Sequence, residues 1–254
     1  MNYIEELARL IRLSASTVFF GGAGVSTESG IPDFRSEGGL YSIAGAYGYS
    51  PEQLLSRSML LNNPELFFRF YREKLSIKAK PNPAHIALAA LEQRGLMDSI
   101  ITQNTDGLHQ AAGSRNVFEL HGTSCIHHCT QCKERYASEY MLDDANCRNY
   151  VPICRQCGSV VRPSVVLYEE GLDEGVVNGA IEAISKAELM IVGGTSLVVY
   201  PAAGLLRFFG KASRGPSQGL VLINKSATSA DEGARMVIRE AIGEVMSGVE
   251  RSLD

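Results

Sequence analysis

The sequence predicts an α/β protein built on a mostly parallel sheet, with a small cysteine-containing insert and a separate helical and loop module. Short segments rich in β-branched and aromatic residues alternate with segments of helical periodicity, which favours parallel strands covered by helices on both faces. Several of the strand-like segments run directly into Gly, Ser, Thr, Asn or His. All six cysteines lie between residues 125 and 157.

The predicted strands are short, apolar and bounded by turn-forming residues, as in Thr17-Val18-Phe19-Phe20, which runs into Gly21. They are residues 17–20, 99–102, 117–120, 165–168, 189–192 and 219–224. The predicted helices carry apolar residues at helical spacing and comprise residues 1–12, 64–71, 84–93, 180–186 and 234–253. Residues 36–50, rich in Gly, Ser and Tyr, are predicted to form a loop that can move.

Composition and charge exclude several classes of protein. Hydrophobic residues make up 45% and charged residues 20% of the 254 residues, as is ordinary for a globular protein. No apolar run reaches the roughly 20 residues of a membrane helix, and residues 1–12 lack the basic start of a signal peptide. The net charge of -4 argues against nucleic acid as a direct ligand. We therefore expect a cytosolic protein that binds neither membrane nor nucleic acid.

Polar or glycine residues follow five of the predicted strands. In open α/β sheets, ligands bind outside the carboxyl ends of the strands. We therefore expect one crevice to gather Gly22, Asn104, His121, Ser196 and Asn224.

The glycine-rich turn at residues 21–26 follows the first strand. Glycines let the backbone approach a pyrophosphate, and the N-terminus of a following helix would favour its negative charge. The fit to GxGxxG is incomplete, because Thr27 stands where the third glycine would be. A tight turn without a ligand is the alternative that this segment leaves open.

The cysteines form two CxxC pairs that together predict a structural zinc site. Four thiolates complete a tetrahedral site and leave no open position for catalysis, and the separation of the pairs is close to that of zinc ribbons. A redox CxxC is the alternative, and His127 or His128 could replace a cysteine. Cys125 and Cys147 are interpreted as ordinary side chains. The predicted ligands are Cys129, Cys132, Cys154 and Cys157.

Three further segments suggest chemistry. His121 follows a strand, and imidazole is the side chain best suited to accept a proton near neutral pH. Residues 103–106, Gln-Asn-Thr-Asp, offer amides and a carboxylate to a ligand, although an Asx-type turn or helix cap explains them equally. Residues 31–35 place an acid, an aromatic ring and a base side by side. A helix cap and a Phe in the core would explain the same residues without a function.

Taken together, these residues resemble the sirtuin family. The matching segments run in the family's order and cover nearly the whole chain: residues 22–35 (GAGVSTESGIPDFR), residues 102–109 (TQNTDGLH), His121-Gly122, the two CxxC pairs, Arg162-Pro163, Gly194-Thr195-Ser196 and Asn224. The first two are long and highly specific.

The resemblance implies an NAD-dependent lysine deacylase with a Rossmann-like domain, a zinc module and a helical and loop cofactor module. In this family the acyl oxygen attacks C1′ of the nicotinamide ribose, and a histidine then activates a ribose hydroxyl, which leads to O-acyl-ADP-ribose and free lysine. By motif, His121 is the base, and Asn104 orders the ribose and a water. The cofactor contacts implied by the matching segments are Gly22, Ala23, Gly24, Ile31, Asp33, Phe34, Arg35, Gln103, Asn104, Asp106, His121, Gly194, Thr195, Ser196 and Asn224.

The sequence departs from the family pattern in places that concern the substrate. Thr105 stands where Ile is frequent, and residues 168–170 read Tyr-Glu-Glu where Phe-Gly-Glu is frequent. Members that favour succinyl or malonyl lysine carry a Tyr and, three residues on, an Arg. In this chain Tyr71 matches the Tyr, and Lys74 stands where the Arg would be. Lys lacks the bidentate fork of Arg, so the resemblance implies deacetylation. The expected acyl-pocket residues are Tyr71, Lys74, Val166 and Tyr168.

The resemblance also implies a division of the chain. Residues 1–35, 79–122 and 163–254 are expected to form the Rossmann-like domain, residues 36–78 the cofactor loop and helical module, and residues 123–162 the zinc module. The expected partners are proteins or peptides that carry acyl-lysine. Mono-ADP-ribosyl transfer on the same scaffold and a non-enzymatic, NAD-sensing binding module are the two alternatives.

Overall fold

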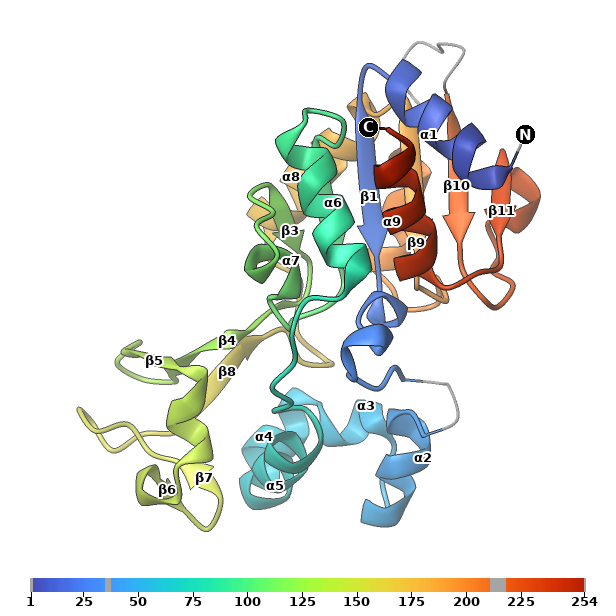
Figure 1. Ribbon diagram of the computed structural model, residues 1–254. Coiled ribbons are helices and arrows are strands. Elements are labelled where there is room, and N and C mark those ends of the chain that lie inside the picture. Colours follow the sequence, from blue (N-terminus) through green and yellow to red (C-terminus); the bar gives the residue numbers. More distant parts are fainter. Residues whose placement is uncertain (1, 35–37, 211–217, 254) are drawn as a thin grey trace.

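The computed structural model describes residues 2–34, 38–210 and 218–253 and contains a six-stranded sheet in which neighbouring strands are parallel. The strand order is β11-β10-β9-β1-β2-β3 (Figure 1). The predicted α/β class is thereby confirmed. The strands are β1 (Thr17–Gly21), β2 (Ser99–Thr102), β3 (Val117–Glu119), β9 (Leu189–Gly193), β10 (Gly219–Ile223) and β11 (Met236–Ile238).

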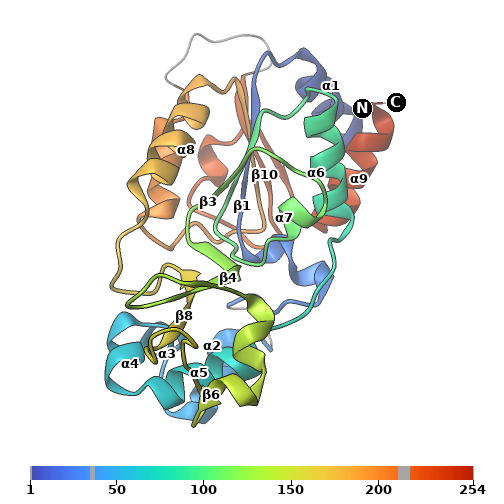
Figure 2. The ribbon, with the colours of Figure 1, turned by 90° about the vertical axis from the view of Figure 1, so that its left-hand side faces the viewer.

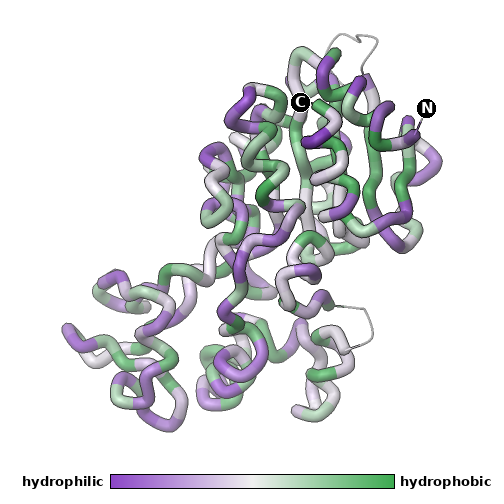
Figure 3. Tube along the Cα trace, viewed as in Figure 1, coloured by the Kyte–Doolittle hydropathy of each residue, from purple (hydrophilic) through white to green (hydrophobic). Residues whose placement is uncertain are grey.

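Helices cover both faces of this sheet (Figure 2). Successive side chains of a strand point to opposite faces, so Phe19 packs against helices α1 (Tyr3–Leu13), α6 (Pro83–Gln93) and α9 (Ile242–Ser252), whereas Phe20 packs on the side of α8 (Glu174–Lys186) and the 3-10 helix η6 (Ala202–Phe208). The strands are accordingly apolar along most of their length (Figure 3). Burial on both faces explains the continuous apolar runs that predicted them.

Three predicted elements are wrong in part. The predicted helix 234–253 begins with strand β11, and α9 starts only at Ile242. The predicted strand 165–168 belongs to β8 only at Val165, because β8 spans Val161–Val165 and the next residues make just an isolated bridge, Ser56 to Tyr168. The predicted loop 36–50 contains a helix, α2 (Leu40–Ala44), and a 3-10 turn, η3 (Gly45–Tyr47).

A helical module lies below the carboxyl edge of the sheet in the view of Figure 1. It comprises α2, η3, α3 (Pro51–Leu54), α4 (Arg57–Asn62) and α5 (Pro64–Lys74), of which only α5 was predicted. Three fully buried phenylalanines of α5, Phe67, Phe68 and Phe70, form the centre of its own hydrophobic core. Met141 and Val151 join this core, so the module packs against the cysteine insert.

Asn82 ties the end of this module to the turn after β1. Its side chain caps α6 by accepting from the backbone N–H groups of Ala84 at 2.9 Å and His85 at 3.4 Å, and Pro83 occupies the first helical turn. Its amide nitrogen donates to the carbonyl of Val25 at 2.7 Å. The segment Pro81-Asn82-Pro83 therefore both starts helix α6 and anchors the turn after β1.

The cysteine insert is antiparallel. Strand β4 (Gly122–Cys129) pairs with β5 (Arg135–Ala137) and β8, and a short ladder joins β6 (Cys147–Arg148) to β7 (Val151–Pro152). Two 3-10 turns, η4 (Ser138–Leu142) and η5 (Asp144–Asn146), connect them. The expected boundary between residues 162 and 163 falls inside β8, because that strand serves the insert's sheet along its whole length.

A short helix, α7 (Leu108–Ala111), follows the loop after β2. No helix in the described part of the chain combines the length and the apolar character needed to cross a membrane.

Candidate active site

The residues expected after five strands all lie at one edge of the sheet. Because β10, β9, β1, β2 and β3 are neighbours and parallel, their carboxyl ends meet there. The strand order places the five residues along this edge in the spatial order Asn224, Ser196, Gly22, Asn104 and His121. These residues are spread over positions 22 to 224 of the chain, and the parallel topology brings them into one row.

The sheet changes winding direction between β1 and β9, and two glycine turns interlock there. The amide of Gly24 donates to the carbonyl of Gly194 at 2.8 Å. A Cβ on Gly24 would lie 2.8 Å from the Cα of Gly194, and Gly194 has a φ of +60 with its added Cβ 2.5 Å from the backbone nitrogen of Val25. Only glycine fits this approach. The turns thus leave bare backbone at the topological switch point, where α/β proteins bind nucleotides.

No α-helix begins after the first glycine turn, contrary to the suggestion that a helix N-terminus follows it. Residues 23–25 and 27–29 form two 3-10 helices of three residues each, η1 (Ala23–Val25) and η2 (Thr27–Ser29). Thr27, at the place of the missing third glycine, turns its hydroxyl back to the carbonyl of Gly24 at 3.0 Å. Any phosphate at this turn would therefore be held by loop amides rather than by a long helix.

Ser26 connects the two polar residues of the loop after β2. Its hydroxyl donates to Oδ2 of Asp106 at 2.7 Å and accepts from Nδ2 of Asn104 at 3.0 Å. The other oxygen of Asp106 accepts from the amide of Leu108, the first residue of α7, at 2.9 Å. Ser26 is 1% exposed. Sequence reasoning missed it as a site residue, although it lies inside the matching glycine segment.

Gln103 links this loop to the two neighbouring strands. Its side-chain amide donates to Oγ1 of Thr195 at 3.0 Å, and its carbonyl lies 2.8 Å from Nδ1 of His121. Because a carbonyl only accepts, Nδ1 must carry the proton, which leaves Nε2 of the neutral ring as the proton acceptor. Burial lowers the pKa of His121 below 6.5, against the smaller opposing effect of the hydrogen bond to Gln103. The ring is therefore neutral at pH 7.

Two other histidines behave differently. His85 and His109 are fully buried, with ring centroids 4.7 Å apart. Burial lowers the pKa of His109 to about 3. A proton acceptor must reach its substrate, and these rings are enclosed, whereas His121 is only half-buried.

The segment 31–34 leads from the glycine turn into the helical module. The amide of Ile31 donates to the carbonyl of Ser26 at 3.3 Å, while the carbonyls of Asp33 and Phe34 accept from the first residues of α2, at 2.9 and 3.0 Å. Arg35 lies outside the described residues. At the opposite end of the row, Asn224 donates its side-chain amide to the carbonyl of Ser226 at 2.8 Å.

The four expected acyl-pocket residues lie in three different surroundings. Val166 lies beside the histidine, because its amide donates to the carbonyl of His121 at 2.8 Å. Tyr71 and Tyr168 both belong to the core of the helical module, and burial raises the pKa of Tyr71. Lys74 instead lines a cavity of about 530 Å³ with residues of α2, η3 and α5, and none of the other three lines it.

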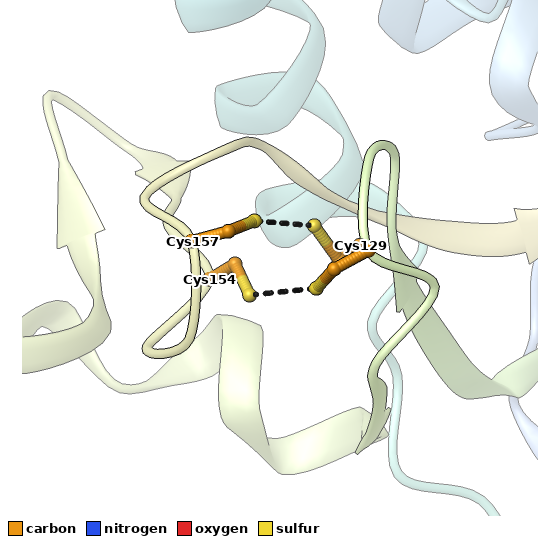
Figure 4. A group of neighbouring side chains, drawn as sticks. Cys129, Cys154 and Cys157 are labelled. Atoms are coloured by element: carbon orange, nitrogen blue, oxygen red, sulfur yellow. Dashed lines mark hydrogen bonds between the residues drawn. The ribbon is translucent and has the colours of Figure 1, made fainter.

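The four cysteine sulfurs of the two CxxC pairs lie within 4.8 Å of one another. The Sγ atoms of Cys129 and Cys157 are 3.4 Å apart and those of Cys132 and Cys154 are 3.5 Å apart (Figure 4). These separations are too long for disulfides, whose sulfurs lie about 2.05 Å apart. They are close to the spacing of about 3.8 Å between sulfurs placed tetrahedrally at about 2.3 Å from one zinc ion.

The two pairs adopt the same chelating turn. In each, the amide after the second cysteine donates to the carbonyl of the first: Lys133 to Cys129 at 3.2 Å, and Gly158 to Cys154 at 3.0 Å. Both of these residues have positive φ, 64 for Lys133 and 75 for Gly158. Four thiolates converging from two like turns fit a structural zinc ion.

A parallel sheet with interlocking glycine turns at its switch point is the architecture of a nucleotide-binding α/β protein. The model of the Sir2 family matches residues 22–201, from the glycine turn through the cysteine insert to the turn after β9. The chain belongs to the Sir2 family, the sirtuins.

Close relatives in sequence match along nearly their whole length. An NAD-dependent protein deacetylase of Clostridium acetobutylicum is 51% identical over 250 residues, covering 98% of this chain and 98% of the relative. One of Clostridium perfringens is 52% identical over 247 residues, covering 97% and 98%.

Solved structures show the same fold. A Sir2 mutant with a deacetylated p53 peptide and 3'-O-acetyl ADP ribose superimposes with a TM-score of 0.88 at 37% identity, covering 98% of this chain and 97% of the other. Sir2 with a p53 peptide and NAD+ gives 0.86 at 37% identity, covering 99% and 98%. Sir2 bound to acetylated peptide gives 0.84 at 36% identity, covering all of both chains.

Proposed function

We propose that this protein removes acetyl groups from lysine side chains of proteins, using NAD+ as co-substrate and forming nicotinamide and O-acetyl-ADP-ribose. Full-length relatives named as NAD-dependent protein deacetylases and Sir2 structures with NAD+ and acetylated peptide support it. The observation that carries the proposal is the hydrogen bond from Nδ1 of His121 to the carbonyl of Gln103, because it presents Nε2 as an acceptor at the carboxyl edge of the sheet.

His121 is the proposed general base, which accepts a proton from a ribose hydroxyl at Nε2. The lowered pKa keeps the ring ready to accept at neutral pH. Asn104, held by Ser26, orients the ribose, and Asp106 with Ile31 binds the carboxamide. When bound, NAD+ supplies an electrophilic ribose carbon. The residues that would hold it are Gly22, Ala23, Gly24, Ile31, Asp33, Phe34, Arg35, Gln103, Asn104, Asp106, His121, Gly194, Thr195, Ser196 and Asn224.

The four cysteines are the proposed ligands of one structural zinc ion. The sulfur separations and the paired chelating turns support this assignment. Four sulfur ligands leave no open position, so the ion holds the insert together and takes no part in the reaction. Such a small insert has little core of its own, with three fully buried residues in its separate hydrophobic cluster, and a metal compensates for that.

We infer a preference for acetyl over succinyl groups. A carboxylate on the acyl chain needs a cation beside the reaction centre, ideally a bidentate one. Lys74 lines a cavity with residues of α2, η3 and α5, whereas Val166 contacts His121 through its backbone, which supports the absence of such a clamp.

The proposal includes the division of labour among the three expected parts. Residues 1–35, 79–122 and 163–254 would bind the dinucleotide, residues 36–78 would close over it, and residues 123–162 would hold the zinc. A reducing compartment such as the cytosol fits the six free cysteines, because disulfides are rare there.

The decisive experiment measures nicotinamide release and peptide deacetylation together. Purified protein is incubated with radiolabelled NAD+ and acetyl-, succinyl- and unmodified lysine peptides. Removal of the acyl group with release of equimolar nicotinamide is expected only for the acylated peptides, and it should be fastest for the acetyl peptide. Label transferred to protein without deacetylation would instead indicate ADP-ribosyl transfer, and NAD+ binding without nicotinamide release would indicate a sensor.

The variant His121→Ala tests the assigned base. Turnover should fall by about 100-fold or more, the typical contribution of general base catalysis, while NAD+ affinity measured by calorimetry changes little. Near-normal turnover would remove His121 from the reaction.

A further inference from the structure

Tyr136 places its hydroxyl against a sulfur of the cysteine cluster. It lies in the middle of β5, and its Oη is 3.1 Å from Sγ of Cys154. The tyrosine is not one of the four sulfur ligands, so this contact lies outside the metal shell itself. A hydroxyl at this distance from a sulfur forms a hydrogen bond.

The direction of this hydrogen bond follows from a second one. The backbone N–H of Arg155 donates to Oη of Tyr136 at 3.2 Å. A phenol oxygen that accepts on one side still has its own proton to give. A thiolate that binds a metal has no proton to offer, so Tyr136 is the donor and Cys154 the acceptor.

The phenol ring is held in place by its neighbours. The rings of Tyr136 and Tyr140 have centroids 4.1 Å apart, and the guanidinium of Arg155 lies 5.0 Å from the centroid of Tyr140. The hydroxyl of Tyr140 donates to the carbonyl of Ile153 at 2.8 Å, one residue before the ligand. Two tyrosines therefore brace the same turn, one through a sulfur and the other through a carbonyl.

Cys154 itself is 2% exposed, whereas Cys132 and Cys157 are exposed. A buried thiolate has few water molecules to satisfy its lone pairs, so a fixed donor matters more to it than to an exposed one. A hydrogen bond to an ionised acceptor is also about twice as strong as a neutral one.

We propose that Tyr136 is a positioning residue of the zinc site, whose hydroxyl donates a hydrogen bond to the Cys154 thiolate and thereby slows release of the metal. The hydrogen bond fixes the direction of the sulfur and so holds the ligand in the position that the metal needs. This inference rests on the zinc assignment in the proposed function, and it concerns the retention of the ion rather than catalysis.

Tyr136→Phe and Tyr140→Phe form a matched pair for the test. Each removes one hydroxyl and keeps its ring, but only Tyr136 touches a sulfur. Zinc content of each purified full-length protein is measured first. Transfer of zinc to a chromogenic chelator and the sulfur-to-cobalt charge-transfer bands of cobalt-substituted protein follow, with thermal unfolding as the structural control.

Tyr136→Phe should speed zinc transfer to the chelator by about 10- to 100-fold, the range by which metal binding typically weakens when a partner of a metal ligand is lost, and should shift the cobalt bands. Tyr140→Phe should match the wild type in both. Equal transfer rates for Tyr136→Phe and wild type, or equal acceleration in both variants, would overturn the inference while leaving deacetylation untouched. Wild-type protein that retains no zinc would overturn the metal assignment and this inference with it.

Discussion

Ser26→Ala is the variant that best tests whether the loop after β2 is held by the glycine turn. Ser26 is nearly inaccessible and makes two side-chain hydrogen bonds, to Asp106 at 2.7 Å and from Asn104 at 3.0 Å. The substitution by alanine removes both hydrogen bonds and deletes only the hydroxyl oxygen. Both proposed site residues thus lose the same partner at once.

The magnitude follows from the two partners. A hydrogen bond to a charged group contributes about 1.5–3 kcal/mol and a neutral one about 0.5–1.5 kcal/mol. Asp106 is half-buried and keeps its bond from the amide of Leu108, so water compensates part of the loss. We expect the free energy of unfolding to fall by about 2 kcal/mol. If the transition state is destabilised by the same amount of about 2 kcal/mol, kcat/KM falls about 30-fold.

Denaturant unfolding and initial rates of nicotinamide release at varied NAD+ concentration measure these two effects. Ser99→Ala is the matched control, because Ser99 is 0% exposed and its hydroxyl has no hydrogen-bond partner. It should leave stability and kcat/KM near the wild-type values. If Ser26→Ala behaved like Ser99→Ala, the loop would not depend on this serine.

Three further outcomes are expected. The acid limb of kcat/KM should lie below pH 6.5, because burial lowers the pKa of His121. For the same reason, the stability contributed by the neutral ring should be lost as the pH falls below 6.5. An acid limb above pH 6.5 would refute this reasoning. Cys129→Ser should lose zinc by elemental analysis while Cys147→Ser keeps it, and equal zinc contents would contradict the ligand assignment. Gly194→Ala should lower unfolding free energy by at least about 1 kcal/mol and raise KM for NAD+, unlike Gly171→Ala, whose added Cβ meets nothing.

The parts of the fold that depend on local pattern were predictable. Buried parallel strands read as apolar runs, and a strand followed by Gly22 or Asn104 implies a shared edge once the sheet is parallel. The cysteine cluster followed from spacing alone, because two CxxC pairs need only fold toward each other. The resemblance to sirtuins, confirmed by the family match, added the activity.

The parts that depend on contacts across the chain were not predictable. Strand β11 has three residues, too few for a periodic signal, and was absorbed into the helix that follows it. Glu28 accepts from the amide of Gly243 at 2.9 Å, a contact between residues 215 apart that no local pattern encodes. Lys133 adopts a positive φ that its residue type disfavours, because the sulfur turn imposes it.

The hydrogen bond from Asn82 to the carbonyl of Val25 brings the two ends of a long excursion of the chain to one point. The helical module between them begins after the turn that follows β1 and ends where α6 begins. Lengthening a segment whose ends are already joined costs only about 0.6 kcal/mol for each doubling. Evolution or design can therefore extend or replace the helices between these anchors and reshape substrate choice, while the nucleotide edge keeps its geometry.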